Sequence, residues 1–358
     1  MKKVGIVTIY DNDNYGNRLQ NYATTEVIKE LGMEPVTIKN SPRLNKKESK
    51  TVFLKKYIAY ILKEKYKRYT KEEKERLKCF KEFNKNINTT SKMYTIYSKF
   101  ENDYDFFVAG SDQIWKPTFG RMSNMDLLDF TDDNKKIAFS ASFGISEVEE
   151  KHKKFLTENL NKFKNISVRE VAGEKIVKDL TGREDVEVLV DPTMLLDAKK
   201  WDMVAKKPKQ LKNDKYILNY FLGELSEERK KEIERIAREN NCEIINILDK
   251  KSPFYQTGPS EFLYLEKNAF LVCTDSFHSS VFSILYNVPF IVFKRENSKV
   301  NMNSRIETLL SKFELEDRYY NGKIEKESLE VDYSNAYKIL ENERKKSINF
   351  LKKAFELK

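Results

Sequence analysis

The sequence predicts an α/β protein with two domains, each built around a parallel sheet. The chain has 358 residues, which is more than a single hydrophobic core usually serves. Its first predicted strand, "KKVGIVTIY", is followed by the helical pattern "NRLQNYATTEVIKELG" and by a second short strand, "EPVTIKN". Because parallel strands need a crossover connection, a parallel sheet with right-handed crossovers is the most economical topology.

Strand and helix patterns continue to alternate along both halves of the chain. We therefore expect one domain over residues 1–198, a second over residues 199–335, and a final helix over residues 336–358. Ligands in such sheets bind beyond the carboxyl ends of the strands, so we expect a site in a cleft between the halves. The later predicted strands are "YDFFVAG", "KKIAFSASFG", "NISVRE", "VEVLVDPTMLL", "DKYILNYFL", "CEIINIL", "NAFLVC" and "VPFIVF".

The composition excludes several classes of protein. Hydrophobic residues make up 40% of the chain, with 23 Phe and 19 Tyr, which is enough to build two cores. The longest apolar runs are too short to span a bilayer, and the start of the chain lacks a signal-peptide pattern, so we expect a cytoplasmic protein. The three cysteines have no metal-ligand spacing and suggest no disulfide framework.

The motifs of several common enzyme classes are missing from the sequence. It has no Walker loop, no GxGxxG, no nucleophile elbow and no cluster of histidines and carboxylates. A P-loop enzyme, an ordinary dehydrogenase and a hydrolase therefore lose their support, and we expect neither a metal nor a cofactor. The stretch "DNDNYGNRLQNY" superficially suggests a calcium loop, but Tyr15 and Tyr22 stand where that loop needs oxygen ligands.

The net charge of +10 is concentrated in one segment. Residues 43–85 contain 16 Lys and Arg against 6 Asp and Glu, and no nucleic-acid-binding motif accompanies them, so we expect no nucleic-acid partner. One interpretation is a pair of solvated helices. The other is a basic amphipathic helix, with Phe53, Tyr57 and Ile61 on one face, that rests on anionic lipid headgroups or on a neighbouring subunit.

One of the two histidines stands between a predicted strand and a predicted helix, in "AFLVCTDSFHSSVFSILYNV". His278 falls in the first turn of that helix, where unpaired backbone N–H groups and the positive end of the helix dipole point outward. Asp275, Ser276, Ser279 and Ser280 surround it, and the serines add hydroxyl donors. The pattern indicates an anion site. The alternative is that Asp275 or Ser276 simply caps the helix and His278 is a surface residue.

Other polar residues follow predicted strands in the same way. "ISVRE" places Arg169 at a strand end, where it can fork onto a carboxylate or a phosphate; the alternative is a structural ion pair with Glu170 or a neighbour. "AGSDQIW" places Asp112 and Trp115 after a strand, and the alternative is a helix cap with Trp115 packed inside. "NMNSRIETLL" places Arg305 beside a helix start, which Asn303 or the serine after it would cap.

These motifs occur in an order that resembles the polysaccharide pyruvyl transferase family. The resemblance extends from about residue 4 to residue 315, is weakest over residues 43–100, and is most specific in "GSDQIW" and "DSFH" taken together. It implies a GT-B-like fold: two Rossmann-like parallel-sheet domains that face each other across a cleft, with the C-terminal helix crossing back onto the N-terminal domain. The N-terminal domain would bind the acceptor, and the C-terminal domain would bind the donor.

The resemblance also implies an activity. Members transfer the enolpyruvyl unit of phosphoenolpyruvate onto two hydroxyls of a sugar, forming a cyclic ketal and releasing phosphate, in the biosynthesis of bacterial capsules and exopolysaccharides. His278 resembles the essential histidine of the family, which would act as general acid or base, and Arg169 resembles its phosphoenolpyruvate-binding arginine. The implied donor-binding residues are Asp275, Ser276, Ser279, Ser280 and Arg305.

The resemblance has two departures and leaves the acceptor open. Many members have Arg where this chain has Ser276 and Gly where it has Ser279, so Arg305 or a lysine would replace the missing charge, or the donor would differ. Trp115 would stack on a sugar face. A free, a polymeric and a lipid-linked acceptor are all compatible with the sequence. The implied acceptor-binding residues are Asn14, Tyr15, Gly16, Asn17, Gln20, Asp112, Gln113 and Trp115.

Two other functions stay open. The fold is shared with glycosyltransferases that use nucleotide sugars, which would bind the nucleotide in the C-terminal half. A non-catalytic scaffold in polysaccharide assembly, bound through the basic segment, is the other alternative. For a lipid-linked acceptor, the same segment would hold an active enzyme at the inner face of the membrane.

Overall fold

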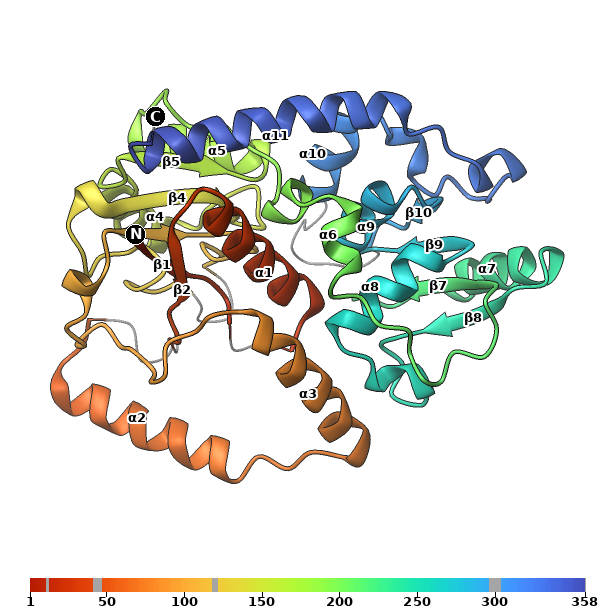
Figure 1. Ribbon diagram of the computed structural model, residues 1–358, viewed down its shortest axis with the longest axis horizontal. Helices are drawn as coiled ribbons and strands as arrows, with labels where there is room; N and C mark the ends of the chain where they lie inside the picture. Colours follow the sequence, from red (N-terminus) through yellow and green to blue (C-terminus); the bar gives the residue numbers. More distant parts are fainter. Residues whose placement is uncertain (11–12, 41–46, 118–121, 296–303, 358) are drawn as a thin grey trace. The chain divides into compact units, whose positions relative to one another are not determined.

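The computed structural model describes residues 1–10, 13–40, 47–117, 122–295 and 304–357, and it contains two parallel sheets flanked by helices (Figure 1). The predicted α/β class is therefore confirmed. Asn303, expected as a possible helix cap, and residues 43–46 of the basic segment lie outside the described residues.

The chain divides into two compact units. Unit 1 comprises Met1–Tyr69, Lys85–Leu195 and Arg344–Lys358, and unit 2 comprises Thr70–Asn84 and Leu196–Glu343. Residues 70–84, which the sequence analysis kept in the first domain, thus belong with the second sheet. The end of the last helix, α11 (Ser334–Ala354), belongs with the first sheet, where Phe350 stacks near Phe139.

Unit 1 contains a six-stranded parallel sheet in the order β2-β1-β3-β4-β5-β6. Its strands are short and mostly apolar because helices cover both faces. Gly5 in β1 allows a close approach, since a Cβ atom there would lie 2.6 Å from the Phe107 ring. The strands are β1 (Lys3–Val7), β2 (Glu34–Thr37), β3 (Phe106–Ala109), β4 (Lys136–Ala141), β5 (Asn165–Val168) and β6 (Glu187–Val188).

Four helices that lie wholly in unit 1 connect these strands. The Asn14 side chain caps the first of them by accepting a hydrogen bond from the backbone N–H of Asn17 at 3.2 Å. Gly182, in the left-handed conformation, ends another. The helices are α1 (Tyr15–Glu30), α2 (Lys50–Lys65), α4 (Glu150–Leu160) and α5 (Val171–Thr181).

Unit 2 contains a four-stranded parallel sheet in the order β10-β9-β7-β8. Ile217 and Leu271 from the sheet pack against Ile233 and Ile236 of a covering helix to form its core. The strands are β7 (Tyr216–Tyr220), β8 (Glu243–Asn246), β9 (Leu271–Thr274) and β10 (Phe290–Val292), and the helices are α3 (Lys71–Phe83), α6 (Ala198–Asp202), α7 (Glu227–Glu239), α8 (Pro259–Asn268), α9 (Phe277–Tyr286) and α10 (Ser304–Phe313).

The two helices of the basic segment differ in how they pack. Helix α3 docks on unit 2, where Nη1 of the buried Arg76 donates to the carbonyl oxygens of Tyr255 at 3.0 Å and Thr257 at 3.3 Å. By contrast, no described side chain of α2 in unit 1 is buried. Buried side chains therefore hold α3 against unit 2, whereas no described side chain does the same for α2 in unit 1.

Candidate functional site

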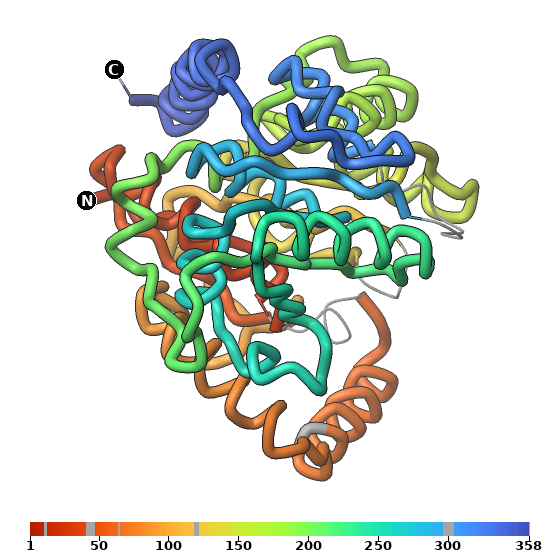
Figure 2. The backbone as a smooth tube through the Cα atoms, turned by 90° about the vertical axis from the view of Figure 1, so that its right-hand side faces the viewer, coloured from red at the N-terminus to blue at the C-terminus, as the bar shows by residue number. Residues whose placement is uncertain are grey.

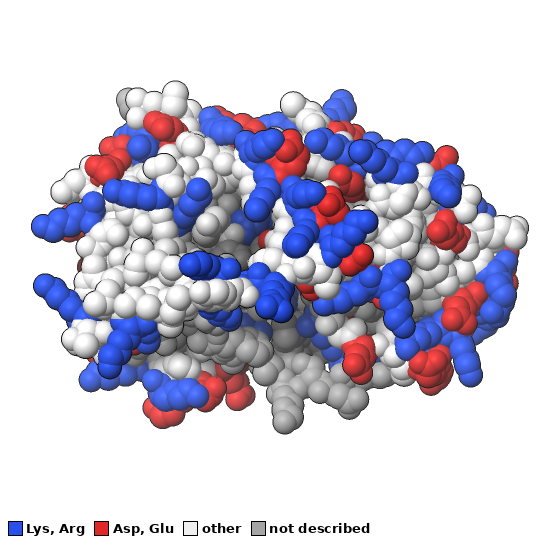
Figure 3. Space-filling view, turned by 90° about the horizontal axis from the view of Figure 1, so that it is seen from below, with Lys and Arg blue, Asp and Glu red and all other residues white. Residues whose placement is uncertain are grey.

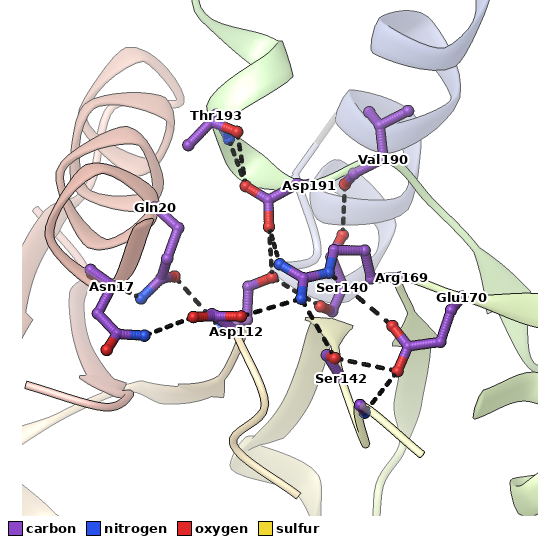
Figure 4. A network of polar contacts seen from close by, with 12 residues as sticks. Asn17, Gln20, Asp112, Ser140, Ser142, Arg169, Glu170, Val190, Asp191 and Thr193 are labelled. Carbon is purple, nitrogen blue, oxygen red and sulfur yellow. Dashed lines mark hydrogen bonds and ion pairs between the residues drawn. The ribbon is translucent and has the colours of Figure 1, made fainter. Parts of the chain in front are cut away.

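The carboxyl edge of the sheet in unit 1 holds a buried charged network centred on Arg169 (Figure 4). Arg169 follows β5, Asp191 follows β6 and Asp112 lies after β3, so neighbouring strand ends bring them together. Nη1 of Arg169 donates to Asp191 Oδ2 at 2.5 Å. Its Nη2 donates to Asp112 Oδ1 at 3.1 Å and to Ser142 Oγ at 3.2 Å.

Neutral donors hold the two aspartates in place. Thr193 donates to Asp191 Oδ1 through its backbone N–H at 3.0 Å and its hydroxyl at 2.7 Å, and the Ser111 hydroxyl donates to Oδ2 at 3.0 Å. Nδ2 of Asn17, on α1, donates to Asp112 Oδ2 at 2.5 Å. The network therefore ties α1 to the ends of β3, β5 and β6.

Glu170 supplies a third carboxylate that sequence analysis considered only as an alternative ion-pair partner. Its Oε2 lies 3.8 Å from Nε of Arg169. Its Oε1 accepts hydrogen bonds from the Ser142 hydroxyl at 3.0 Å and from the backbone N–H groups of Phe143 at 2.9 Å and Gly144 at 3.0 Å. Glu170 thus fixes the turn after β4 against the end of β5.

The environment of Arg169 favours the structural alternative for this residue. Its side chain is 1% exposed, and the paired carboxyls of Asp191 and Glu170 are fully buried. Burial alone would lower the pKa of Arg169, but the charges of Asp191, Asp112 and Glu170 outweigh burial and raise it. The guanidinium stays charged, and its fork is directed at carboxylates of its own chain rather than at solvent.

Most of the implied acceptor-binding residues are also enclosed in unit 1. The side chain of Gln20 is fully buried, donating to the Thr8 hydroxyl at 2.7 Å and accepting from the Ser111 backbone N–H at 3.2 Å. Trp115 is fully buried as well, and its Nε1 donates to the Asp126 carbonyl at 3.1 Å. Trp115 therefore has the packed position left open as an alternative. Tyr15, Gly16, Asn17 and Asp112 are buried, whereas Asn14 and Gln113 are half-buried.

The carboxyl edge of the sheet in unit 2 is built differently. Helix α9 begins directly after β9, with Ser276 as its N-cap residue, and His278 lies in the first turn. The Ser276 side chain makes no capping hydrogen bond, so it does not satisfy the N–H groups of that turn. His278 is 5% exposed, with its ring at right angles to that of Phe277 and 5.2 Å between centroids.

Asp275 organises the chain around this helix start instead of capping it. Its Oδ1 accepts from the Leu222 N–H at 2.7 Å and its Oδ2 accepts from the Gly223 N–H at 2.8 Å, which fixes the segment after β7. Nε of Arg295 donates to the same Oδ2 at 2.7 Å, and its Nη2 donates to the Asp275 carbonyl at 3.3 Å. Asp275 therefore holds a cationic side chain next to the residue that begins the α9 turn.

The other implied donor-binding residues have different positions. The Ser279 hydroxyl donates to Glu266 Oε1 on α8 at 2.5 Å, and the Ser280 hydroxyl donates to the Ser276 carbonyl at 3.1 Å. Both serines are fully buried. Arg305 is a buried residue in the first turn of α10, a helix that packs against α9. The contact across the fold at this helix start is therefore the pair of Asp275 with Arg295.

Arg295 is the residue that sequence analysis missed. It lies three residues beyond the end of β10, and β10 pairs with β9 so that Val292 is opposite Thr274. An arginine that follows a strand at the same sheet edge was the available signal, in "VPFIVFKRE". Arg295 thus supplies a positive charge near Ser276, the position where the family resemblance lacks one.

The fold and this geometry define an α/β protein in which a helix begins at the carboxyl edge of a parallel sheet, with His278 in its first turn. Among the described residues, no group of three or more His, Cys, Asp or Glu side chains is arranged to hold a metal ion, and no helix is long and apolar enough to cross a membrane. The model of the polysaccharide pyruvyl transferase family matches residues 14–297, and the chain belongs to that family.

Similar solved structures have low sequence identity to this chain. A putative UDP-N-acetylglucosamine 2-epimerase from Listeria monocytogenes is 11% identical, with a TM-score of 0.47 and coverage of 98% of this chain and 90% of its own. The UDP-GlcNAc 2-epimerase from Methanocaldococcus jannaschii is 14% identical, with a TM-score of 0.45 and coverage of 95% and 92%, respectively. No curated protein matches the sequence.

Proposed function

We propose that this protein transfers the pyruvyl unit of phosphoenolpyruvate onto two hydroxyls of a sugar during polysaccharide biosynthesis. Membership of the polysaccharide pyruvyl transferase family supports pyruvyl transfer. The donor and the ketal product are our inference. In this reaction both sugar oxygens bond to the carbon that carried the phosphate ester, the C–O bond to phosphate breaks, and the methylene carbon becomes a methyl group.

The helix start in unit 2 is the observation that carries the proposal. Phosphoenolpyruvate has a carboxylate and a phosphate, and it needs cationic or helix-end partners. The first turn of α9 offers backbone N–H groups and the positive end of its dipole. Arg295 adds a guanidinium, which binds carboxylate and phosphate groups through a planar fork.

His278 is the group that we assign to proton transfer. It lies in the same first turn, and an imidazole can act as a general acid or a general base. In the proposed step, His278 protonates the methylene carbon while the first sugar hydroxyl attacks the neighbouring carbon and loses its proton to the vacated base. The second hydroxyl then displaces phosphate, which leaves with the second proton, so that the reaction balances.

Calorimetric titration with phosphoenolpyruvate tests this proposal without knowledge of the acceptor. We expect the wild type to bind, and we expect His278→Ala to retain affinity within about threefold, because the helix N–H groups and Arg295 supply most of the anion contacts. A wild type that fails to bind phosphoenolpyruvate would overturn the proposal. Binding of UDP-sugars in its place would support the glycosyltransferase alternative.

A second property, contact with an anionic membrane, is proposed from helix α2. Its apolar side chains recur at the spacing of one helical face and are exposed to solvent by 36–56%. A helix of this length is marginal in water unless an apolar face packs against something. The side chains of this face are Leu54, Tyr57, Ile58, Ile61 and Leu62.

The positive charge around this face favours an anionic membrane over a second copy of the helix as its partner. Lys50, Lys55, Lys56, Lys63 and Lys65 lie on the same helix, and Figures 1 and 3 show α2 at the lower edge of unit 1 and a surface there rich in Lys and Arg. A second copy of α2 would bring two lysine-rich surfaces together, whereas anionic headgroups complement them. Each Lys near such a surface contributes about 1 kcal/mol.

Co-sedimentation with vesicles tests the membrane proposal. We expect binding to vesicles that contain an anionic phospholipid, weaker binding at high salt, and little binding to neutral phosphatidylcholine vesicles. The double variant Leu54→Glu with Ile58→Glu should lose binding, whereas Met203→Glu, at an 82% exposed residue of unit 2, should keep it. Binding that is equal on neutral vesicles, or unaffected by salt, contradicts electrostatic docking.

A further inference from the structure

A cavity in unit 2 adjoins the anion site and has no assigned ligand. It has a volume of about 460 Å³, within the range of ordinary small-molecule sites. It lies where the N-terminal part of α7 faces the carboxyl ends of β7 and β8; Figure 2 shows α7 in green toward the viewer. Gly223, whose N–H binds Asp275, is one of its lining residues. The cavity and the α9 anion site therefore share the segment after β7.

Two asparagines form the floor of the cavity. Their side chains lie on the face of the sheet toward α7, because successive residues of a strand point to opposite faces. Asn219 of β7 and Asn246 of β8 are register partners on the face that carries Ile217 and Ile244. Nδ2 of Asn219 donates to Asn246 Oδ1 at 2.9 Å. Asn219 is 8% exposed, and its Oδ1 has no hydrogen-bond partner among the described residues. A buried carbonyl oxygen in this state costs free energy, which a ligand donor would recover.

The walls and the rim restrict the kind of ligand. Apolar side chains form much of the lining, so one face of the ligand must be apolar. Lys230, Glu234 and Asp249 carry both signs of charge at the mouth, which disfavours a strongly charged ligand of either sign. The apolar lining residues are Phe221, Leu225, Ile233, Ile244 and Leu248.

We propose that this cavity binds an uncharged sugar ring of the acceptor. A pyranose has an apolar C–H face for the walls and hydroxyl donors for Asn219 Oδ1, and its other hydroxyls can reach Lys230 and Asp249. The proposal rests on the proposed pyruvyl transfer, for which a sugar must lie beside the donor. It also gives the acceptor a site in unit 2, since the implied acceptor-binding residues Trp115 and Gln20 of unit 1 are buried within their own chain.

Saturation-transfer NMR with methyl glycosides tests this assignment. The probes are the methyl pyranosides of glucose, galactose, mannose and N-acetylglucosamine, with uridine as a nucleobase probe. We expect at least one glycoside to bind the wild type at millimolar concentration. Leu225→Trp, which fills the half-buried wall, should weaken that binding at least tenfold. Lys230→Ala should weaken it severalfold, whereas Lys231→Ala, on the next residue of α7, should not.

Phosphoenolpyruvate affinity separates this inference from the proposed function. Leu225→Trp and Lys230→Ala should bind phosphoenolpyruvate as the wild type does, because neither residue belongs to the first turn of α9 or to the Asp275–Arg295 pair. If the protein did not bind phosphoenolpyruvate but bound a glycoside in a way that Leu225→Trp weakened, the cavity would be supported as a sugar site. Phosphoenolpyruvate would then be overturned as the donor. No glycoside binding, glycoside binding unaffected by Leu225→Trp, or displacement of the glycoside by uridine would overturn the sugar assignment.

Discussion

The two sheets place charged groups at equivalent edges, yet these edges have different chemical character. In unit 1, the guanidinium of Arg169 lies among Asp112, Asp191 and Glu170, each held by further hydrogen bonds. In unit 2, Arg295 lies at the strand ends, pairs with Asp275, and has a side chain that is 14% exposed. The guanidinium at the first edge is enclosed by carboxylates, whereas the guanidinium at the second edge is partly exposed to solvent.

The comparison shows that position at a carboxyl edge does not by itself make a charged residue a ligand-binding one. Both arginines follow strands, and both occupy places where α/β proteins bind ligands. The difference lies in the surroundings of each guanidinium: Arg169 is buried among three carboxylates, whereas Arg295 pairs with Asp275 and is partly exposed. An arginine that already neutralises several buried carboxylates stabilises the fold, because removing it leaves those charges unpaired.

The largest expected effect is on the stability of unit 1. Arg169→Met should lower the free energy of unfolding by about 3–5 kcal/mol, since it leaves Asp112 and Asp191 buried without their cation. Urea denaturation followed by circular dichroism measures the loss, and hydrogen exchange assigns it to unit 1. Lys175→Met, which removes the exposed ion pair with Asp179 on α5, should change stability far less, because solvent screens that pair.

The Arg169→Met variant also tests whether the two sheet edges differ in function. If Arg169→Met were as stable as the wild type but no longer bound phosphoenolpyruvate, the two edges would both be donor-binding surfaces. The distinction between a structural and a binding arginine would then fail.

The second effect concerns the donor. Arg295→Gln should weaken phosphoenolpyruvate binding about 10- to 100-fold, which is the loss of one charge-assisted hydrogen bond of about 1.5–3 kcal/mol. Calorimetry measures the affinity, and thermal unfolding should show a much smaller change than for Arg169→Met. Arg238→Gln, at an exposed residue near the end of α7, is the matched control and should bind normally. Undiminished affinity in Arg295→Gln would place the donor elsewhere.

Local patterns in the sequence predicted much of the fold and only part of the site. Short apolar runs and helical spacing located the parallel strands and the turn that holds His278, because those features depend on neighbouring residues. The partners of Arg169 come from three other strand ends, and Arg295 reaches Asp275 through the pairing of β10 with β9. Such contacts depend on tertiary packing. The same reason explains why α3 was not expected to join unit 2.

The smallest expected effect is a pH dependence of stability. It arises from a buried carboxyl group in unit 2 and extends the comparison of the two units. Glu266 is fully buried on α8, where it accepts a hydrogen bond from the Ser279 hydroxyl and lies near the Ser283 hydroxyl, instead of a guanidinium. Burial raises its pKa well above the ordinary value of 4.5, and the hydroxyls only partly oppose this. The folded protein therefore retains a proton that the unfolded chain releases.

The sign of the effect follows from that retained proton. The contribution of Glu266 to the free energy of unfolding should be fully present below the pKa of Glu266 in the unfolded chain. It should fall as pH rises towards the pKa of Glu266 in the folded protein, by up to about 1.4 kcal/mol per pH unit. Glu266→Gln keeps a neutral side chain at every pH, so its stability relative to the wild type should increase with pH. Urea denaturation from pH 5 to pH 9 measures this difference. For Glu227, whose pKa is lowered by the hydrogen bond from Lys230, substitution by Gln should give no trend over this range, because the folded and unfolded states have both lost the proton there. Parallel curves for Glu266→Gln and the wild type would show that Glu266 is ionised in the folded state, and that a cation beside unit 2's edge compensates it as Arg169 does in unit 1.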